Sequence, residues 1–209
     1  MLNAGVLTFR EFAMHEPLPL ATIQQAVLEF LQGRDDAVVF GAHAVNAYVD
    51  EPRMTQDVDL ISCRARDLAQ ELKGHLSQRF HMAVRVREVS QGKGFRLFQL
   101  RKAGNRHLVD VRPVGSLPPA QRIEGVLVIS PADLVAQKVM AYHQRRGQPK
   151  SWTDRRDLAV LLLRFPELKR DSGAVEDCLR AAGADSSVLA AWRELVAQEI
   201  LPEDEEEAI

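Results

Sequence analysis

The sequence has few cysteines, and the two that it has, Cys63 and Cys178, lie far apart along the chain. Two cysteines are too few for a disulfide framework, and they lack the short spacing of a cysteine metal site. Thiols of this kind are typical of a reducing compartment. We therefore expect two reduced cysteines in a cytoplasmic protein.

Long apolar runs are also missing. One of the longest, from Leu158 to Leu163, is far shorter than the ~20 residues that cross a bilayer. The first residues are interrupted by charges such as Arg10 and Glu11, and they lack the basic and apolar regions of a signal peptide. We expect no membrane segment.

Neither sign of charge is in excess. The 27 Lys and Arg residues and 29 Asp and Glu residues give a net charge of −2. The whole surface is therefore not an obvious polyanion binder, and any contact with nucleic acid would have to come from a local patch. At 209 residues, 46% of them hydrophobic, the chain can form one larger domain or a domain with a helical appendage.

The spacing of apolar residues predicts alternating helices and strands first, and helices alone afterwards. Helices are expected at 20–32, 42–49 and 65–80, and strands at 37–40, 57–62, 83–89, 95–100, 107–111 and 126–129. Further helices are expected from residue 130 and at 154–165, 173–182 and 186–200. This order predicts an α+β fold, with a mixed sheet and flanking helices in 1–129, a helical region in 130–200 and an acidic tail in 201–209.

Asp57 and Asp59 stand two apart in one predicted strand. Residues with this spacing point to the same face of a sheet, so the two carboxylates would lie side by side. Their mutual repulsion would raise the pKa of one of them unless a cation lies nearby. Carboxylate oxygens suit Mg²⁺ or Mn²⁺, and the pair therefore indicates a divalent-metal site.

Gly41 lies where a predicted strand turns into a helix. A glycine at such a turn lets the backbone approach a phosphate, and the helix start offers free N–H groups to an anion. Alone, an Asp pair is more often solvated or salt-bridged, and a strand–glycine–helix turn more often serves packing. Together and in this order, they favour a metal-dependent phosphoryl-transfer site.

The segment GAHAVNAY followed by PRMTQDVDL, from Gly41 to Leu60, resembles the signature of the nucleotidyltransferase superfamily. It is most similar to the AbiEii-type toxin branch, in which Arg-x-Thr precedes the Asp pair, as Arg53 to Thr55 do here. The resemblance implies a polymerase-beta-like fold. It also implies transfer of a nucleotide from an NTP to an acceptor hydroxyl, with Mg²⁺ or Mn²⁺ as cofactor.

The resemblance further implies a third carboxylate on a later strand, and Asp110 fits because its neighbours alternate correctly. An ordinary surface Asp is the alternative at this position. The implied catalytic and metal-binding residues are Asp57, Asp59 and Asp110. The implied nucleotide-binding residues are Gly41, Ala42, Thr55, Lys138 and Asp154.

Lys138 is expected in the middle of an apolar helix face. Burying an unpaired ammonium group is costly, so a phosphate or a carboxylate such as Asp154 would offset that cost. Alternatively, the long side chain reaches solvent. A basic stretch from Arg145 to Arg156 contains Trp152; it could hold an RNA backbone, although a solvated loop is favoured.

Ala42 departs from the family pattern, which has Gly or Ser after the first glycine. No hydroxyl is then available to a phosphate oxygen, and three functions stay open. The first is nucleotidyl transfer to tRNA or another RNA in a toxin–antitoxin context, with an antitoxin protein as partner. The second is a weak or inactive module that binds a nucleotide or a partner, and the third is transfer to a small molecule. His43 could touch phosphate, although a histidine without catalytic role is favoured.

Overall fold

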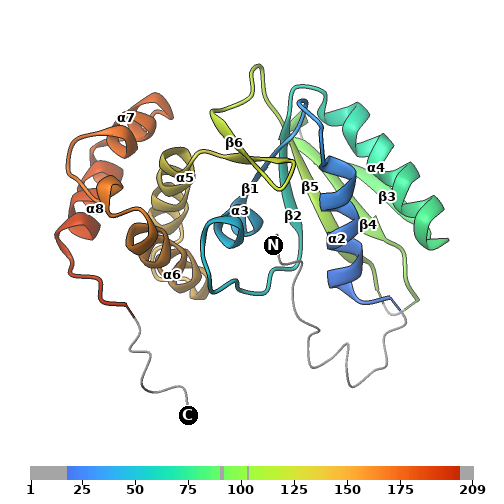
Figure 1. Cartoon of the computed structure of the whole chain (residues 1–209), viewed down its shortest axis with the longest axis horizontal. Helices are drawn as coiled ribbons and strands as arrows, with labels where there is room; N and C mark the ends of the chain where they lie inside the picture. The colour runs from blue at the N-terminus through green and yellow to red at the C-terminus, as the bar shows by residue number, and fades with distance from the viewer. Residues whose placement is uncertain (1–17, 90–91, 103, 203–209) are drawn as a thin grey trace, which may run out of the picture. The chain divides into compact units, whose positions relative to one another are not determined.

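The computed structural model of the chain describes residues 18–89, 92–102 and 104–202 (Figure 1). It divides into two compact units, residues 1–130 and 131–209. Most of the predicted acidic tail, 203–209, lies outside the described residues. None of the helices in the described ranges has the length and hydropathy that a bilayer span requires.

The first unit contains a seven-stranded mixed sheet with the strand order β3-β4-β5-β2-β1-β7-β6. The strands are β1 (Val38–Phe40), β2 (Val58–Ser62), β3 (Val84–Val89), β4 (Gly94–Gln99), β5 (Arg106–Pro113), β6 (Ala120–Ile123) and β7 (Val126–Ile129). The pairs β2–β5 and β1–β7 are parallel, and the other pairs are antiparallel. The helices among the described residues of this unit are α2 (Leu20–Leu31), α3 (Gly41–Tyr48) and α4 (Ala65–Phe80). The predicted α+β class is confirmed.

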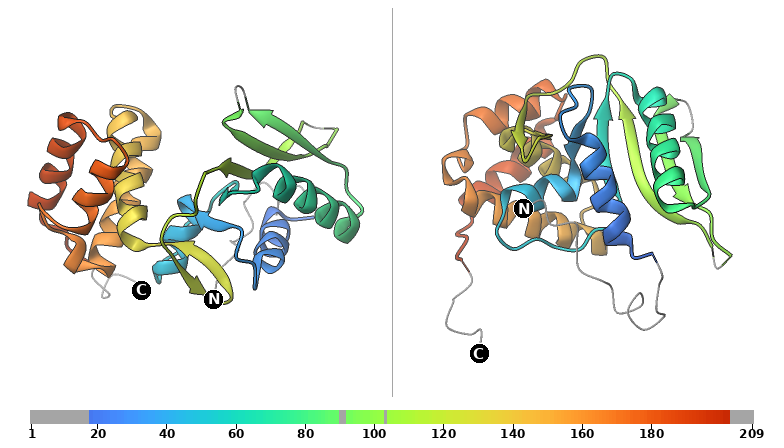
Figure 2. Two further views of the ribbon diagram at one scale, coloured as in Figure 1. Left: turned by 90° about the horizontal axis from the view of Figure 1, so that it is seen from above. Right: turned by 45° about the vertical axis from the view of Figure 1, so that its right-hand side comes forward.

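Helix α4 covers one face of β3, β4 and β5 (Figure 2). Its apolar stripe is buried, with Leu68, Leu72 and Leu76 each at 0% exposure. Leu97 of β4 and Val109 of β5 are fully buried as well. Because strand residues alternate between faces, the residues next to these in sequence lie on the opposite face of the sheet.

Strands β2 and β5 run in register, with Val58 beside Val109 and Asp59 beside Asp110. Val58 and Leu60 are fully buried, whereas Asp59 is half-buried. The two-residue period inferred from the sequence therefore holds in β2. Asp57 directly precedes the strand, which begins at Val58.

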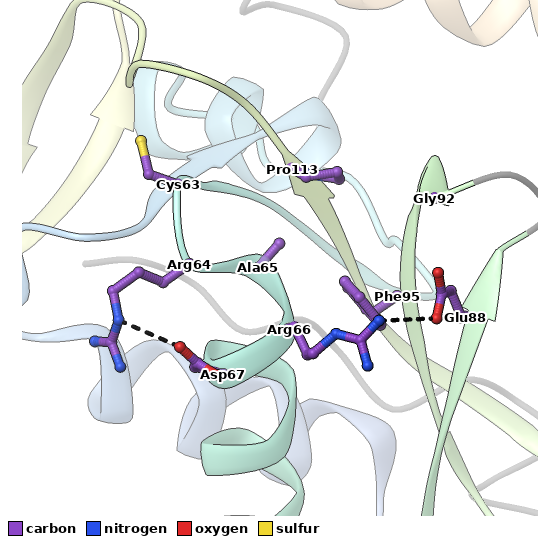
Figure 3. Close-up of a pocket in the computed structure, with 9 residues that line it drawn as sticks. All are labelled: Cys63, Arg64, Ala65, Arg66, Asp67, Glu88, Gly92, Phe95 and Pro113. Carbon is purple, nitrogen blue, oxygen red and sulfur yellow. Dashed lines mark hydrogen bonds and ion pairs between the residues drawn. The ribbon is translucent and has the colours of Figure 1, made fainter.

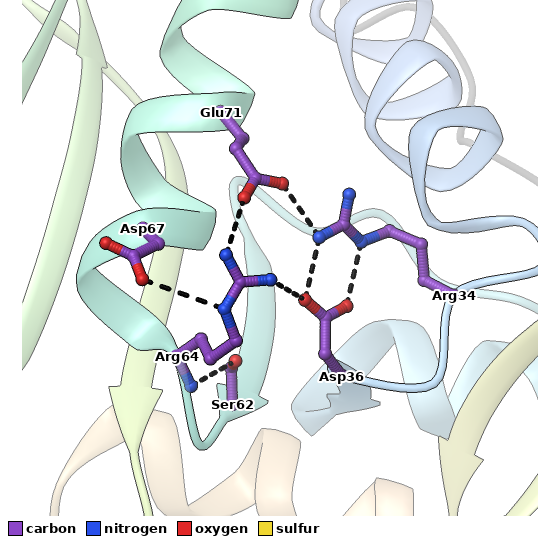
Figure 4. Close-up of polar contacts among 6 residues, drawn as sticks. All are labelled: Arg34, Asp36, Ser62, Arg64, Asp67 and Glu71. Atoms are coloured by element: carbon purple, nitrogen blue, oxygen red, sulfur yellow. Dashed lines mark hydrogen bonds and ion pairs between the residues drawn. The ribbon is translucent and has the colours of Figure 1, made fainter.

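An ion-pair network joins the turn after α2 to the start of α4 (Figure 4). Arg34 lies 2.7 Å from both Asp36 and Glu71, and Arg64 lies 3.1 Å and 3.2 Å from the same two carboxylates. The hydrogen bond between Arg34 and Asp36 raises the pKa of the Arg34 guanidinium and lowers the pKa of the Asp36 carboxyl. Single exposed pairs contribute little, but this alternating network ties the turn between α2 and β1 to the first turns of α4.

The second unit is helical, as predicted: α5 (Pro131–Gln144), α6 (Pro149–Arg164), the short 3₁₀ helix η2 (Pro166–Leu168), α7 (Ala174–Ala181) and α8 (Ser186–Ala197). Its core includes Trp192 and Leu158, which are buried. Asp185 caps α8 by accepting hydrogen bonds from the N–H groups of Ser187 and Val188. This unit buries its own apolar residues.

Two elements differ from the sequence predictions. Strand β6 was not predicted, because Ala120–Ile123 shows no two-residue apolar period and pairs only with β7, at the edge of the sheet. Helix α6 begins at Pro149 rather than at Asp154. Proline suits the first helical position, where its missing N–H group has no partner to lose.

Candidate metal and nucleotide site

Gly41 brings the backbone of the β1–α3 turn against the carboxylate of Asp59. Its φ angle is +67°, and a Cβ atom added there would lie 2.1 Å from Oδ2 of Asp59. Glycine adopts this φ without steric cost, whereas other residues do so rarely. The glycine is therefore required by two independent constraints, its backbone angle and the closeness of Asp59.

No side chain caps the start of α3, which follows Phe40 directly. The first N–H groups of a helix have no intrahelical partner and carry partial positive charge, so they attract anions. Ala42 is buried and contributes no polar group. Any contact of this turn with phosphate would therefore involve backbone amides.

The loop before β2 is held by side chains of α2 and α3. Asn46 of α3 donates to the carbonyl of Arg53 at 2.8 Å and accepts from its N–H at 3.0 Å. Gln24 of α2 donates to the carbonyl of Thr55 at 3.0 Å. The Thr55 hydroxyl donates to the carbonyl of Asp57 at 3.3 Å. These bonds position the Asp57 backbone, and they give Thr55 a structural contact beside its predicted contact with nucleotide.

His107 joins two of the three predicted carboxylates, Asp57 just before β2 and Asp110 in β5. Its Nδ1 lies 3.1 Å from Oδ2 of Asp57, and its Nε2 lies 3.2 Å from Oδ1 of Asp110. Arg96 of β4 donates through Nε to the same oxygen of Asp110 at 2.9 Å. The structure therefore brings Asp57 and Asp110 to one place, beside Asp59.

The hydrogen bonds to Asp110 and Asp57 raise the pKa of His107 to about 9. In the metal-free protein the imidazole is therefore protonated at neutral pH, and its positive charge lies between two carboxylates. Like charges this close repel, so a cation between them lowers the energy of the cluster. His107 supplies part of the compensation that the sequence analysis assigned to a metal ion.

The donor set also fits a divalent metal. One ligand atom from each of Asp57, His107 and Asp110 lies within 4.8 Å of the other two, and Asp59 is the strand neighbour of Asp110. Carboxylate oxygens suit Mg²⁺, while an imidazole nitrogen also suits Mn²⁺. His107 would have to lose its proton to coordinate a metal.

Sequence reasoning missed His107 and Arg96. In a regular strand His107 and Asp110, three residues apart, would point to opposite faces. A bulge brings them together, because Leu97 of β4 pairs with Val109 while Phe98 pairs with His107, which leaves Leu108 as an extra residue in β5. Bulges re-aim side chains in this way, but an apolar period does not reveal them.

His43 is buried next to the site, on α3. Burial lowers the pKa of its imidazole to about 4, against the opposing field of Asp57. The ring is therefore neutral at neutral pH, and its Nε2 atom has no hydrogen-bond partner within the part of the chain that the structure describes. No contact between His43 and a phosphate follows from this burial.

Lys138 and Asp154, the two predicted nucleotide contacts in the second unit, belong to a buried ion cluster. Nζ of Lys138 lies 2.6 Å from Asp157 and 3.7 Å from Asp154. Asp154 also accepts from Arg145 at 2.7 Å. Carboxylates thus offset the burial of Lys138, as the sequence analysis allowed. Their contact with a nucleotide stays a prediction.

The basic stretch from Arg145 to Arg156 is not one continuous loop, because α6 begins at Pro149. Arg145 pairs with Asp154, and Arg146 lies 3.5 Å from Glu194. Trp152 is 67% exposed. Part of the positive charge of this stretch is therefore compensated inside the unit.

A pocket of about 470 Å³ lies at the start of α4, between Cys63 and Pro113 (Figure 3). Two arginines in its wall are paired, Arg64 with Asp67 at 3.6 Å and Arg66 with Glu88 at 3.2 Å. It adjoins the carboxyl end of β2, whereas the Asp pair lies at the amino end. The carboxylate cluster and this pocket are therefore separate features.

Solved structures of other proteins are similar to this chain in fold. The Megavirus polyadenylate synthase is similar in structure, with a TM-score of 0.60 at 14% identity over 78% of this chain. This chain spans only 35% of that protein. JHP933 from Helicobacter pylori has a TM-score of 0.52 at 13% identity, covering 91% of this chain and 90% of its own. These likenesses show the fold.

No curated protein matches the sequence. The profile of one family, described as "Nucleotidyl transferase AbiEii toxin, Type IV TA system", matches residues 25–208. This match extends over both units and includes the Gly41 turn and all three predicted carboxylates. The chain therefore belongs to the AbiEii family of nucleotidyltransferase toxins.

Proposed function

We propose that the protein is a metal-dependent nucleotidyltransferase that moves a nucleotide from an NTP to an acceptor hydroxyl, with Asp57, Asp59 and Asp110 as its catalytic residues. The observation that supports this most is the meeting of Asp57 and Asp110 around His107. Asp59 lies between the cluster and the glycine turn, as strand neighbour of both Asp110 and Phe40. The family match supports the same reaction class.

In this proposal Asp57 and Asp59 hold Mg²⁺ or Mn²⁺ through carboxylate oxygens. The bound metal would neutralise triphosphate charge and favour departure of pyrophosphate. Asp110 would accept the proton of the acceptor hydroxyl, or act as a further ligand. The amides at the start of α3 would hold phosphate oxygens, with Gly41 leaving room for them.

The acceptor is an RNA, with tRNA as one candidate, and an antitoxin protein is the partner in a cell. The toxin–antitoxin description of the family supports this context. Lys138 and Asp154 complete the proposed nucleotide contacts. Thr55 acts through the Asp57 backbone, which its hydroxyl contacts at 3.3 Å.

The test is transfer of label from each of the four NTPs, radiolabelled at the α-phosphate, to a cellular RNA extract. We expect labelled RNA with the unaltered protein and Mg²⁺ or Mn²⁺, and none with Asp59→Asn. Asp67→Asn is the matched control, because Asp67 is an exposed carboxylate at the start of α4. Undiminished labelling by Asp59→Asn would reject the proposed role. Label found only on small hydroxyl compounds would reassign the acceptor.

A second candidate is a nucleotide-binding module without transfer. Two observations favour it: Asp110 is already engaged by Arg96 and His107, and Ala42 offers no hydroxyl. Calorimetry with an NTP and Mg²⁺ separates the two candidates when it is combined with the transfer assay. Binding that Asp59→Asn weakens, without labelling of any acceptor, would favour the module.

A further inference from the structure

The face of the β3–β4–β5 sheet that points away from α4 carries arginines. Glu88 and Phe95 contact Arg66 of α4, so they mark the helix-covered face (Figure 3). The residues that alternate with them, Arg87 of β3 and Arg96 of β4, therefore lie on the other face. Both are exposed, as is Arg85. We call the set Arg85, Arg87, Arg96 and Phe98 the arginine face.

The arginine face continues without interruption into the carboxylate cluster. Arg87 is the strand neighbour of Arg96, and Arg96 is the strand neighbour of Asp110. Asp110 in turn is the neighbour of Asp59. Adjacent strands lie about 4.8 Å apart, so Arg87 is about 10 Å from Asp110.

Two of these arginines hold charge that no carboxylate compensates. Among the described residues, no acidic side chain pairs with Arg85 or Arg87. All acidic groups of this face lie on the β2 and β5 side, where Asp57, Asp59 and Asp110 are. The face therefore has a positive half, on β3 and β4, and a negative half, on β2 and β5, where the three carboxylates outnumber the cations His107 and Arg112.

The positive half also offers an aromatic surface. Phe98 stacks on His107, with ring centroids 5.1 Å apart and 30° between the ring planes. It is half-buried, so part of the ring reaches solvent. Positive charges that follow a backbone, together with an aromatic group for base stacking, are the elements of single-strand binding.

We propose that the arginine face binds the sugar–phosphate backbone of a single-stranded RNA end and leads its terminal hydroxyl to Asp110. This inference rests on the proposed function and adds to it the surface that would bind the RNA acceptor. The positive half attracts the strand, and the negative half repels phosphates where no metal is bound. A small hydroxyl compound bound at Asp110 would be too short to contact Arg87, about 10 Å away. A polynucleotide is long enough to contact both.

The test is fluorescence anisotropy of a short fluorescein-labelled single-stranded RNA, titrated with full-length protein at several KCl concentrations and without NTP. The variant is Arg85→Gln with Arg87→Gln. We expect about tenfold weaker binding, and a plot of log K against log salt that is shallower by about 1.4, since each phosphate contact contributes about 0.7. The matched control is Arg66→Gln with Arg79→Gln, two exposed arginines of α4. It should bind RNA like the unaltered protein.

Equal binding by the variant and the unaltered protein would overturn the proposal, and so would equal weakening in the control. The anisotropy measurement contains no NTP, so its result does not depend on the transfer reaction. RNA binding that falls in the variant, in a protein that transfers no label, supports the arginine face and rejects the proposed function. Where transfer is observed, the variant should raise KM for RNA and leave KM for the NTP unchanged.

Discussion

Gly41 and Asp59 lie so close that a Cβ atom on the glycine would be 2.1 Å from the carboxylate oxygen. Gly41 directly follows β1 as the first residue of α3, and Asp59 lies in the antiparallel neighbour β2, where it pairs with Phe40. This closeness places a half-buried carboxylate beside the uncapped start of α3. The pair therefore links the proposed metal ligands to the proposed phosphate contact.

Gly41→Ala should destabilise the protein and displace the Asp59 carboxylate. Gly33→Ala is a matched control, because Gly33 has a similar φ of +73° but open space around the added Cβ. We expect the control to lose about 1 kcal/mol from backbone strain alone. Gly41→Ala should lose more and should also lose nucleotidyl transfer. Urea unfolding of both variants measures the difference, and equal losses would argue against the close contact.

His107→Ala should leave the carboxylates of Asp57 and Asp110 facing each other without the imidazolium. The variant should be less stable than the unaltered protein when no metal is present. Mg²⁺ or Mn²⁺ should then raise its Tm more than that of the unaltered protein, because the metal no longer competes with a protonated ring. Calorimetric melting with and without each metal tests this. An equal rise in Tm for both proteins would show that His107 does not compete with the metal.

His43 should make the protein sensitive to acid. Its folded pKa of about 4 lies below the ordinary value of 6.5, so the unfolded chain takes up the proton first as pH falls. Stability is therefore fully present above pH 6.5 and falls toward pH 4, by up to about 3 kcal/mol. His43→Leu should flatten this part of the profile. Urea unfolding at a series of pH values tests this prediction. If the stability of His43→Leu and of the unaltered protein falls in parallel with pH, His43 is not the cause of the acid sensitivity.

Lys138 and Asp157 form a buried ion pair at 2.6 Å in the second unit. Lys138→Met should cost about 3–5 kcal/mol, because it leaves a buried carboxylate without its partner. The double variant Lys138→Met with Asp157→Asn should recover part of that loss. A double-mutant cycle of unfolding free energies gives the coupling. Additive losses would mean that Asp154 or solvent satisfies Lys138 instead.

The sequence allowed the order of elements and the position of the Asp pair to be predicted, because both depend on local periods. Val58 and Leu60 are buried around Asp59, as alternation requires. Asp110 could be placed by the same alternation within β5. Contacts that depend on strand pairing could not be predicted from local periods. That Asp59 lies beside Asp110 follows only from the register of β2 and β5.

The position of His107 could not be predicted from local sequence patterns. Its position opposite Asp57 depends on the extra residue Leu108, which only the pairing of β4 with β5 reveals. Strand β6 was missed for a related reason, since an edge strand that pairs on one side needs no apolar period. The cost of burying a charge predicted a phosphate or a carboxylate such as Asp154 as the partner of Lys138, with solvent as the alternative. The shortest contact of Lys138 is with Asp157 rather than Asp154.

In the proposed function, Asp57, Asp59 and Asp110 converge to hold one divalent cation. Electron paramagnetic resonance of Mn²⁺, titrated with protein and a non-hydrolysable NTP analogue, counts the bound ion directly. We predict that Asp59→Asn and Asp110→Asn each weaken Mn²⁺ binding by at least about tenfold, as loss of a carboxylate ligand should. Asp67→Asn should leave it unchanged. Equally tight Mn²⁺ binding by all three variants would show that Asp59 and Asp110 are not ligands of the ion.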